Sequence, residues 1–323
     1  MSIKIIFDQF KETLVDLPFF VFRDKKVENL NLISKLLFLI KSKFIILIYK
    51  LFDKNLYCFF MNLFYKKDGR ISFSKQHKTY LKHHENNQIH YPNKTRILGS
   101  MVNHNYELDN LLFSYGLDSF NVEKDDLIID CGANVGNLFL SINRFVENFN
   151  YKAFEPDTMA FKCLELNLSK FKNADLHCIG LSNENSNKKF YINADTGDSS
   201  LEAFSTEASI DIDTRELDSF KYKKVKLLKI DAEGHELEVL LGAKNTLPNI
   251  EYIAVDMGAE KGESGENTVA LVTNYLINQN FELVKFKENR TTGLFKNLIY
   301  NKTTFYRNYK YFDFGFYNEL LKT

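Results

Sequence analysis

The sequence predicts an α/β fold with a doubly wound, mostly parallel sheet, preceded by a helical N-terminal extension. From about Tyr106 onward, short apolar runs alternate with stretches of helical periodicity, a pattern typical of βαβ units and of a parallel sheet. Hydrophobic residues make up 45% of the 323 residues, which is enough for a large core. With 14 Gly, 4 Pro and 4 Cys, the composition excludes a collagen-like, disordered or disulfide-based protein.

The elements of the sheet domain are predicted in chain order from these runs. The predicted strands are Leu127–Asp130, a short strand that ends with Ala153-Phe154, then Leu176–Ile179, Val225–Ile230, Tyr252–Val255, Phe281–Phe286 and Leu298–Tyr300. Apolar residues at helical spacing predict helices from Val135 to Phe149, from Phe161 to Phe171, from Leu237 to Leu241 and over Thr268–Asn278. Gly242 is expected to end the third of these helices.

The first hundred residues differ from the rest in charge. Residues 1–100 carry 18 Lys and Arg against 8 Asp and Glu, whereas the remaining residues carry 24 against 34. We therefore divide the chain into a basic, apolar, helical segment with a linker, residues 1–100, and the α/β domain, residues 101–323. The His-rich residues 68–100 are interpreted as the linker; adjacent His83 and His84 would face different ways, so no metal cluster is predicted. The excess of acidic residues after residue 100 argues against a nucleic-acid partner.

Residues 30–64 are dense in Leu, Ile, Phe and Tyr. Two central lysines cost about 2.5–3.5 kcal/mol each on insertion, which cancels the apolar gain and makes a membrane-spanning helix marginal. Lys35, Lys43, Lys50 and Lys54 are predicted to share one narrow helical face. Two interpretations stay open: a helix buried against protein, or one in peripheral contact with an anionic membrane through residues 30–64.

The cysteines and the N-terminus indicate the compartment. Cys58, Cys131, Cys163 and Cys178 show no C-x-x-C spacing, which gives no support to a zinc or thioredoxin-like site. No obvious signal peptide is present, so we expect reduced thiols in a cytoplasmic protein, peripheral at the inner face of the membrane if residues 30–64 bind lipid.

Glycines and acidic residues follow the predicted strands. Asp130-Cys131-Gly132-Ala133-Asn134-Val135-Gly136 follows the first strand, Glu155-Pro156-Asp157 the second and Gly180-Leu181-Ser182 the third. Asp231-Ala232-Glu233-Gly234-His235-Glu236 follows the fourth, and an acidic stretch begins at Asp256 after the fifth. Ligands of such sheets bind beyond the carboxyl ends of the strands. Because clustered carboxylates repel one another unless ligand or solvent lies between them, this edge is predicted to bind a ligand.

The first loop is suited to a nucleoside. Gly132 and Gly136 allow a tight turn and close approach of the backbone, and Asn134 tolerates left-handed dihedrals. The middle glycine of the G-x-G-x-x-G pyrophosphate motif is replaced by Asn134, which disfavours a dinucleotide. Glu155 follows Gly136 by 19 residues, at the end of the next strand, from which a carboxylate reaches ribose hydroxyls.

The strand-end motifs resemble a known family. The order Asp130-x-Gly132-Ala133-Asn134-x-Gly136, Phe154-Glu155-Pro156, Leu217-Asp218 and Leu228-Lys229-Ile230-Asp231-x-Glu233-Gly234-x-Glu236 is similar to that of the FkbM-type methyltransferases. These are class I, Rossmann-like enzymes that use S-adenosylmethionine. The resemblance covers roughly residues 105–300. It departs from the family pattern at Asp256, where Glu often stands.

The resemblance implies a role for each site residue. Asp130, Gly132, Asn134 and Gly136 would line the methionine and sugar portions of the cofactor, Glu155 would bind the ribose hydroxyls, and Asp157 and Ser182 would lie near the adenine. Asp231 and Glu233 would face the methyl group and the acceptor. The implied reaction is O-methylation of a sugar hydroxyl in a surface glycan or glycolipid precursor.

A hydroxyl acceptor needs a general base, and Glu233 or Asp231 is the predicted one, with His235 next. Simpler roles stay open: Glu233 as the cap of a helix that starts at Gly234, and His235 on a helix surface. Two other functions also stay open. In one, Asp231 and Asp256 hold a divalent cation for O-methylation of a small molecule. In the other, the domain binds the cofactor as a non-catalytic assembly partner. Lys229 is expected to pair with a carboxylate.

Overall fold

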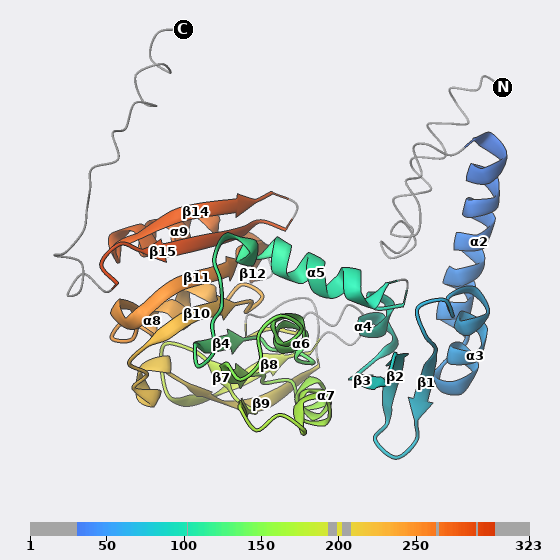
Figure 1. The fold of residues 1–323 in the computed structure, drawn as a ribbon, viewed down its shortest axis with the longest axis horizontal. Coiled ribbons are helices and arrows are strands. Elements are labelled where there is room, and N and C mark those ends of the chain that lie inside the picture. The colour runs from blue at the N-terminus through green and yellow to red at the C-terminus, as the bar shows by residue number, and fades with distance from the viewer. Residues whose placement is uncertain are drawn as a thin grey trace, which may run out of the picture.

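A computed structural model describes residues 31–101, 103–192, 199–201, 208–262, 265–288 and 290–300. It shows a seven-stranded sheet with helices around it, and a smaller N-terminal unit of two long helices and a three-stranded sheet beside it (Figure 1). We call residues 31–101 the N-terminal unit.

The central sheet has the spatial order β14-β15-β11-β10-β4-β5-β6. Its strands are β4 (Leu127–Cys131), β5 (Asn150–Phe154), β6 (Ala174–His177), β10 (Val225–Ile230), β11 (Ile250–Asp256), β14 (Phe281–Lys287) and β15 (Thr292–Asn297). Strands β6, β5, β4, β10 and β11 pair in parallel, and the β14–β15 hairpin adds antiparallel strands beside β11. The predicted doubly wound, mostly parallel sheet is confirmed.

Helices and short strands connect and cover this sheet. They are α5 (His104–Ser114), α6 (Asn137–Asn143), α7 (Thr158–Leu168), α8 (Glu236–Leu241) and α9 (Val269–Asn278), the 3-10 helices η3 (Leu117–Ser119), η4 (Leu217–Phe220) and η5 (Leu247–Asn249), and the strands β7 (Gly180–Leu181), β8 (Ser186–Tyr191), β9 (Ser209–Arg215), β12 (Ala259–Lys261) and β13 (Glu266–Asn267). Asp157 caps α7 by accepting from the backbone N–H groups of Met159 and Ala160. Gly242 ends α8, as predicted.

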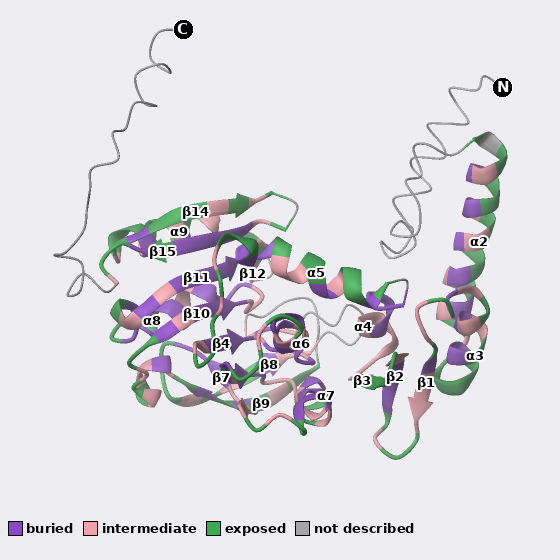
Figure 2. Ribbon diagram, viewed as in Figure 1, coloured by how far each residue is buried: buried purple, intermediate pink, exposed green. Residues whose placement is uncertain are grey.

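The period of two along each strand builds two apolar layers. Ile128 packs with residues of α6 and α7, whereas Ile129, its neighbour in the chain, packs with residues of α8 and α9. Both side chains are fully buried. The strands β4, β10 and β11 are accordingly buried along nearly their whole length in Figure 2.

Several predicted helices and strands differ from the structure at their ends. Val135 and Phe149 are buried but lie outside α6, and Phe171 lies beyond α7. The third predicted strand ends at His177 rather than at Ile179. The prediction of a strand at Leu298–Tyr300 was wrong, because the paired and buried residues are those of β15, Thr292–Asn297.

Residues 68–100 do not form the predicted linker. They fold into β1 (Ile71–Ser74), β2 (Thr79–His84), β3 (Asn87–Tyr91) and α4 (Lys94–Leu98). The three strands form an antiparallel sheet that buries Tyr80, Ile89 and Tyr91. The first four residues of β2 are all buried, and two of them are polar, Thr79 and Lys82, which is one reason why the stretch looks hydrophilic in sequence.

Helices α2 (Leu32–Leu51) and α3 (Lys54–Phe64) form the rest of the N-terminal unit. The predicted single lysine face was wrong, because Lys35 is buried, Lys43 and Lys50 are exposed, and Lys54 belongs to α3. One face of α2 packs into a cluster with α3 and the small sheet, which agrees with the first of the two interpretations. Among the helices described, none has the length and apolar character needed to cross a bilayer.

Candidate functional site

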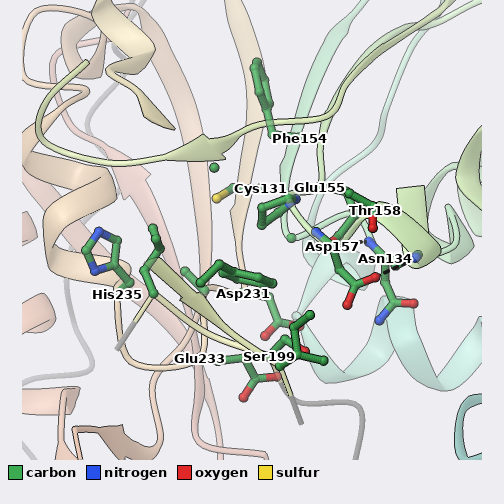
Figure 3. A pocket seen from close by; sticks show the side chains of 18 of the residues that line it. Cys131, Asn134, Phe154, Glu155, Asp157, Thr158, Ser199, Asp231, Glu233 and His235 are labelled. Carbon is green, nitrogen blue, oxygen red and sulfur yellow. Dashed lines mark hydrogen bonds between the residues drawn. The ribbon is translucent and has the colours of Figure 1, made fainter. Parts of the chain in front are cut away.

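A cavity of about 390 Å³ lies at the carboxyl ends of β4, β5 and β10, where the sequence predicts the site (Figure 3). Its walls come from the loops after these strands, from the β14–β15 hairpin and from the N-terminal unit. Seven of the ten predicted site residues line it: Gly132, Asn134, Glu155, Asp157, Asp231, Glu233 and His235. Asp130, Gly136 and Ser182 do not.

The first loop requires glycine at its narrowest point. Gly132 has a φ of 75°, and a Cβ atom built on it would lie 2.0 Å from the carbonyl oxygen of Asp231. Lys229 donates from Nζ to the carbonyl oxygen of Gly132 at 2.7 Å. The loops after β4 and β10 are therefore in direct backbone contact, which brings the two motifs to one cavity.

Glu155 is fixed by backbone donors. Its carboxylate oxygens accept from the N–H of Asn134 at 2.7 Å and from the N–H of Asp157 at 2.9 Å. Burial raises the pKa of Glu155 to about 7, although both N–H groups oppose the shift. The residue thus presents a rigid carboxyl group to the cavity, and this group gains or loses its proton near neutral pH.

Asp130 and Gly136 support the loop from inside the protein. Asp130 accepts from the Tyr151 hydroxyl and forms an ion pair of 3.0 Å with Lys229, so the predicted pairing of Lys229 is confirmed. Burial holds the pKa of Asp130 above its ordinary value. Gly136 lies so close to α7 that a Cβ atom would approach Leu164 to 2.9 Å, which makes it a packing position.

His235 is buried and engaged. Its Nε2 lies 2.9 Å from the Ser182 hydroxyl, and its Nδ1 lies 3.8 Å from the carboxylate of Glu238. Ser182 also accepts from Lys188 Nζ at 3.1 Å. The helix-surface interpretation of His235 was wrong, since its exposed fraction is 5%. Ser182 does not line the cavity itself but contacts His235, which does.

Glu233 does not cap a helix. Helix α8 starts at Glu236, and the Glu236 carboxylate accepts from the N–H of Gly234 at 2.8 Å. Glu233 itself has a φ of 49°, a left-handed conformation held by a 2.6 Å hydrogen bond from the Ser200 hydroxyl to its carbonyl oxygen. Its side chain lines the cavity, as does that of Ser199 (Figure 3). The capping alternative was therefore wrong.

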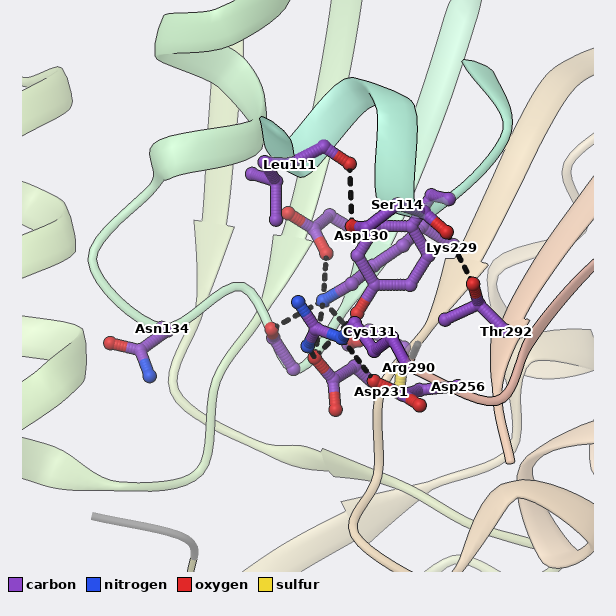
Figure 4. A network of polar contacts seen from close by, with 12 residues as sticks. Leu111, Ser114, Asp130, Cys131, Asn134, Lys229, Asp231, Asp256, Arg290 and Thr292 are labelled. Carbon is purple, nitrogen blue, oxygen red and sulfur yellow. Dashed lines mark hydrogen bonds and ion pairs between the residues drawn. The ribbon is translucent and has the colours of Figure 1, made fainter. Parts of the chain in front are cut away.

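Arg290 joins the carboxylate that follows β10 to the carboxylate of the last residue of β11 (Figure 4). Its guanidinium donates to Asp231 at 2.9 Å and to Asp256 at 2.5 Å. The Tyr115 hydroxyl donates to the same oxygen of Asp231 at 2.6 Å, and the guanidinium carbon lies 4.8 Å from the centre of the Tyr115 ring. This arrangement places a fixed cation where the metal-assisted alternative places a divalent ion. The described residues contain no group of three or more His, Cys, Asp or Glu side chains placed to hold a metal ion.

The same contacts separate the pKa values of the two aspartates. Burial would raise the pKa of Asp231, but the charges of Lys229 and Arg290 outweigh it and hold that pKa below its ordinary value. Burial and the neighbouring Asp231 charge raise the pKa of Asp256 to about 6, against the pull of Arg290. Asp231 is therefore ionised at neutral pH.

The sequence matches a family model over the same residues. Residues 130–283 match the model described as "Methyltransferase FkbM domain". This part of the chain is therefore similar to FkbM methyltransferase domains, and we call residues 130–283 the FkbM domain below. The family resemblance of the strand-end motifs is thereby confirmed.

Two kinds of relative accompany the FkbM match. The chain is 30% identical over 142 residues to the "Hexuronic acid methyltransferase AglP" of Haloferax volcanii, covering 42% of this chain and 58% of that protein. It therefore spans less than two thirds of that relative. Among solved structures, an FkbM methyltransferase of Methylobacillus flagellatus is 17% identical with a TM-score of 0.41, covering 55% of this chain and 44% of that one. TrmK of M. capricolum, solved with S-adenosyl-homocysteine, is 11% identical with a TM-score of 0.36, covering 60% and 69%.

The sequence motifs missed the residues that other segments add to the FkbM domain. Arg290 lies in the turn of the β14–β15 hairpin. Because the last strand was predicted at Leu298–Tyr300 instead of Thr292–Asn297, the sequence did not place Arg290 next to the site. Pro92, Asn93 and Arg96 of the N-terminal unit also line the cavity, although residues 68–100 read as a linker. Ser199 was not missed: the Gly/Asp/Ser-rich sequence at Asp198-Ser199-Ser200 allows either a loop over the acceptor or an ordinary turn, and Ser199 lines the cavity, whereas Asp198 lies outside the described residues.

Proposed function

We propose that this chain moves a methyl group from S-adenosylmethionine to an oxygen of an acceptor, a sugar hydroxyl of a surface glycan or glycolipid precursor. The observation that carries the proposal is the buried Glu155 carboxylate, held by two backbone N–H groups at the cavity of the FkbM domain. From this position a carboxylate accepts the two ribose hydroxyls of a nucleoside.

The residues present fit this cofactor. The cavity of about 390 Å³ lies in the range of small-molecule sites, about 300–1,000 Å³. Gly132 leaves room for a ligand against the backbone, and the carboxylates of Asp157, Asp231 and Glu233 suit a ligand with positive charge. Bound S-adenosylmethionine supplies an electrophilic methyl group on a positively charged sulfur.

The chain's own part in the reaction is to position the acceptor and to take its proton. Holding two reactants in line is worth up to about 7–11 kcal/mol of the barrier. Asp231 is already bound to Arg290, Lys229 and Tyr115, so it is better suited to fixing charge in the site than to accepting a proton. Glu233 is the better general base of the two, and His235 is less suited because its Nε2 faces Ser182.

Two observations support a sugar acceptor beside a membrane. The curated relative is named for a hexuronic acid, and Arg96, which lines the cavity, would favour an acceptor with negative charge. Helix α2 exposes a row of apolar side chains: Ile33, Leu36, Leu37, Ile40, Phe44, Leu47 and Leu51. The exposed Lys43 and Lys50 on the same helix suit anionic lipid. We place the protein at the cytoplasmic face of such a membrane.

Calorimetric titration with S-adenosylmethionine and S-adenosyl-homocysteine tests the cofactor site. The wild-type chain should bind both, and Glu155→Ala should bind each at least about tenfold more weakly, because hydrogen bonds to a charged group contribute about 1.5–3 kcal/mol each. Only the ionised carboxylate accepts both hydroxyls, so wild-type affinity for S-adenosyl-homocysteine should fall as the pH drops below about 7.

The matched control is Glu165→Ala, an exposed glutamate on α7 that should leave both affinities unchanged. Thermal unfolding of each variant without ligand separates loss of the site from loss of the fold. A wild-type chain that binds neither compound at high micromolar concentration, or a Glu155→Ala variant that binds like the wild type, contradicts the proposal.

A further inference from the structure

A second cavity lies in the N-terminal unit and adjoins the first. It has a volume of about 600 Å³ and shares Pro92 and Asn93 with the cavity of the candidate site. Its other walls come from the junction of α2 and α3, from β1 and β2 with the turn between them, and from the start of α4. No residue of the FkbM motifs lines it, so the methyl-transfer proposal leaves it without a role.

Lysines dominate this second cavity. Lys54, Lys75, Lys78 and Lys94 line it, together with a single acidic residue, Asp53. The carboxylate of Asp53 accepts from the hydroxyl of Tyr80, another lining residue. The charge balance of the lining side chains is therefore strongly positive, and a concave positive surface concentrates anions.

The lysines differ in how firmly they are held. Lys94 donates to the carbonyl oxygens of Tyr49 and Phe52 at 2.7 and 3.3 Å, and its Nζ lies 4.6 Å from the centre of the Tyr49 ring. Lys75 and Lys78 stand exposed at the turn between β1 and β2. One cation is thus built into the wall, and two can move toward a ligand, which suits a group with several charged oxygens such as a phosphate or diphosphate.

The second cavity lies between the candidate site and the exposed apolar row of α2. It touches the candidate site through Pro92 and Asn93, and it touches the C-terminal end of α2 through Tyr49. The same helix carries the exposed apolar row. A ligand with a sugar, a phosphate and an apolar chain, in that order, matches the order of the three surfaces.

We propose that the lysine-lined cavity binds the phosphate or diphosphate group of the acceptor, so that the acceptor is a phosphate-linked sugar on an apolar carrier. The inference rests on the proposed function for its account of the acceptor. The binding of phosphate groups itself requires neither cofactor nor methyl transfer, and it can be measured alone.

Titration of the full chain with inorganic pyrophosphate at low ionic strength tests the site, since salt screens exposed lysines. The wild type should bind, and the double variant Lys75→Glu/Lys78→Glu should bind at least about tenfold more weakly, because each reversal replaces attraction by repulsion. The matched control is Lys124→Glu/Lys223→Glu, two exposed lysines that line neither cavity, and it should bind like the wild type. Affinity for S-adenosyl-homocysteine should be the same in all three proteins.

Vesicles distinguish the sources of the phosphate. Flotation with phosphatidylcholine vesicles that contain a polyprenyl diphosphate should be lost in the Lys75→Glu/Lys78→Glu variant and reduced by added pyrophosphate. Equal effects with phosphatidylglycerol vesicles would overturn the assignment to the acceptor in favour of ordinary lipid headgroups. A wild type that ignores millimolar pyrophosphate, or a control pair that loses as much affinity, would overturn the site. Pyrophosphate binding without any S-adenosyl-homocysteine binding would instead contradict the proposed function and leave this site standing.

Discussion

Asp231 shows how single residues divide the work of the candidate site. It forms contacts with Lys229, Arg290 and Tyr115, and the charges of Lys229 and Arg290 hold its pKa below the ordinary value despite burial. A carboxylate so stabilised in its ionised form is a weak proton acceptor. Glu233 follows two residues later and lines the same cavity. Because the neighbouring charges make Asp231 a weak proton acceptor, we assign the general base to Glu233.

We predict that Glu233→Gln lowers the turnover number by about 10²–10⁴-fold, the usual contribution of a general base. The amide keeps the shape of the side chain but cannot take the acceptor proton, so affinity for S-adenosyl-homocysteine should stay unchanged. Methyl transfer from labelled S-adenosylmethionine to a phosphate-linked sugar measures turnover.

Glu165→Gln, on the exposed face of α7, is the control and should keep wild-type turnover. Unchanged turnover in Glu233→Gln would move the base to another residue. A wild type that binds the cofactor but methylates no sugar acceptor would favour the non-catalytic alternative.

The sequence motifs correctly predicted residues of the cavity where those residues directly follow a strand. Gly132 and Glu155 stand out because a tight turn and a carboxylate follow successive strands, and both line the cavity. Arg290 and Arg96 could not be found this way. Each is a lone arginine outside the strand-end motifs, and only the β14–β15 hairpin and the N-terminal unit bring them to the cavity.

At the scale of elements, buried parallel strands were the easiest to predict. Val225–Ile230 is β10 residue for residue, because most of its side chains are apolar and buried, as in a strand covered on both faces. Strand β15 was missed because it begins Thr292-Gly293, and the exposed Leu298 and Ile299 mimic a strand just beyond it. The small antiparallel sheet of β1, β2 and β3 was missed because its half-exposed strands carry too many polar residues.

Helix α2 is the element that we expect to touch a membrane. We predict that the wild-type chain floats with anionic vesicles in a salt-sensitive way and that Leu36→Glu/Leu47→Glu abolishes the flotation. The two leucines are 57% and 48% exposed, so their replacement should leave the fold intact while removing apolar contact with the bilayer.

Leu271→Glu/Ile277→Glu on α9 is the control, because these side chains are exposed to a similar extent, 49% and 53%. It should float like the wild type. Flotation that ignores salt or vesicle charge would contradict the anionic membrane. Persistent flotation of the α2 variant, together with a change in oligomeric state, would show that a second copy of the chain covers this face.

At the scale of the whole molecule, the N-terminal unit and the FkbM domain share packing. Val135 and Cys163 of the domain belong to the same apolar cluster as Tyr57 and Tyr91 of the N-terminal unit. Lys162 and Lys170, on and just after α7, donate to the carbonyl oxygen of His77 and to the Asn87 side chain. The division of the chain at residue 100 stays a prediction, but the unit is positioned to hold Arg96 and Asn93 at the cavity.

Asn167 of α7 fastens the two parts together, and its removal should loosen them selectively. Its side chain accepts from the N–H of His90 at 2.7 Å and donates to the carbonyl oxygens of His90 and Val135 at 3.0 and 2.9 Å. Each buried group left without a partner costs about 1–3 kcal/mol, so Asn167→Ala should lower the free energy of unfolding and speed amide hydrogen exchange in β3 more than in β10. Asn62→Ala is the matched control, because Asn62 makes a similar pair of 2.8 Å bonds with Ile71 inside the N-terminal unit and should speed exchange in β1 only. Equal acceleration in β3 and β10 would mean that the two parts open as one body.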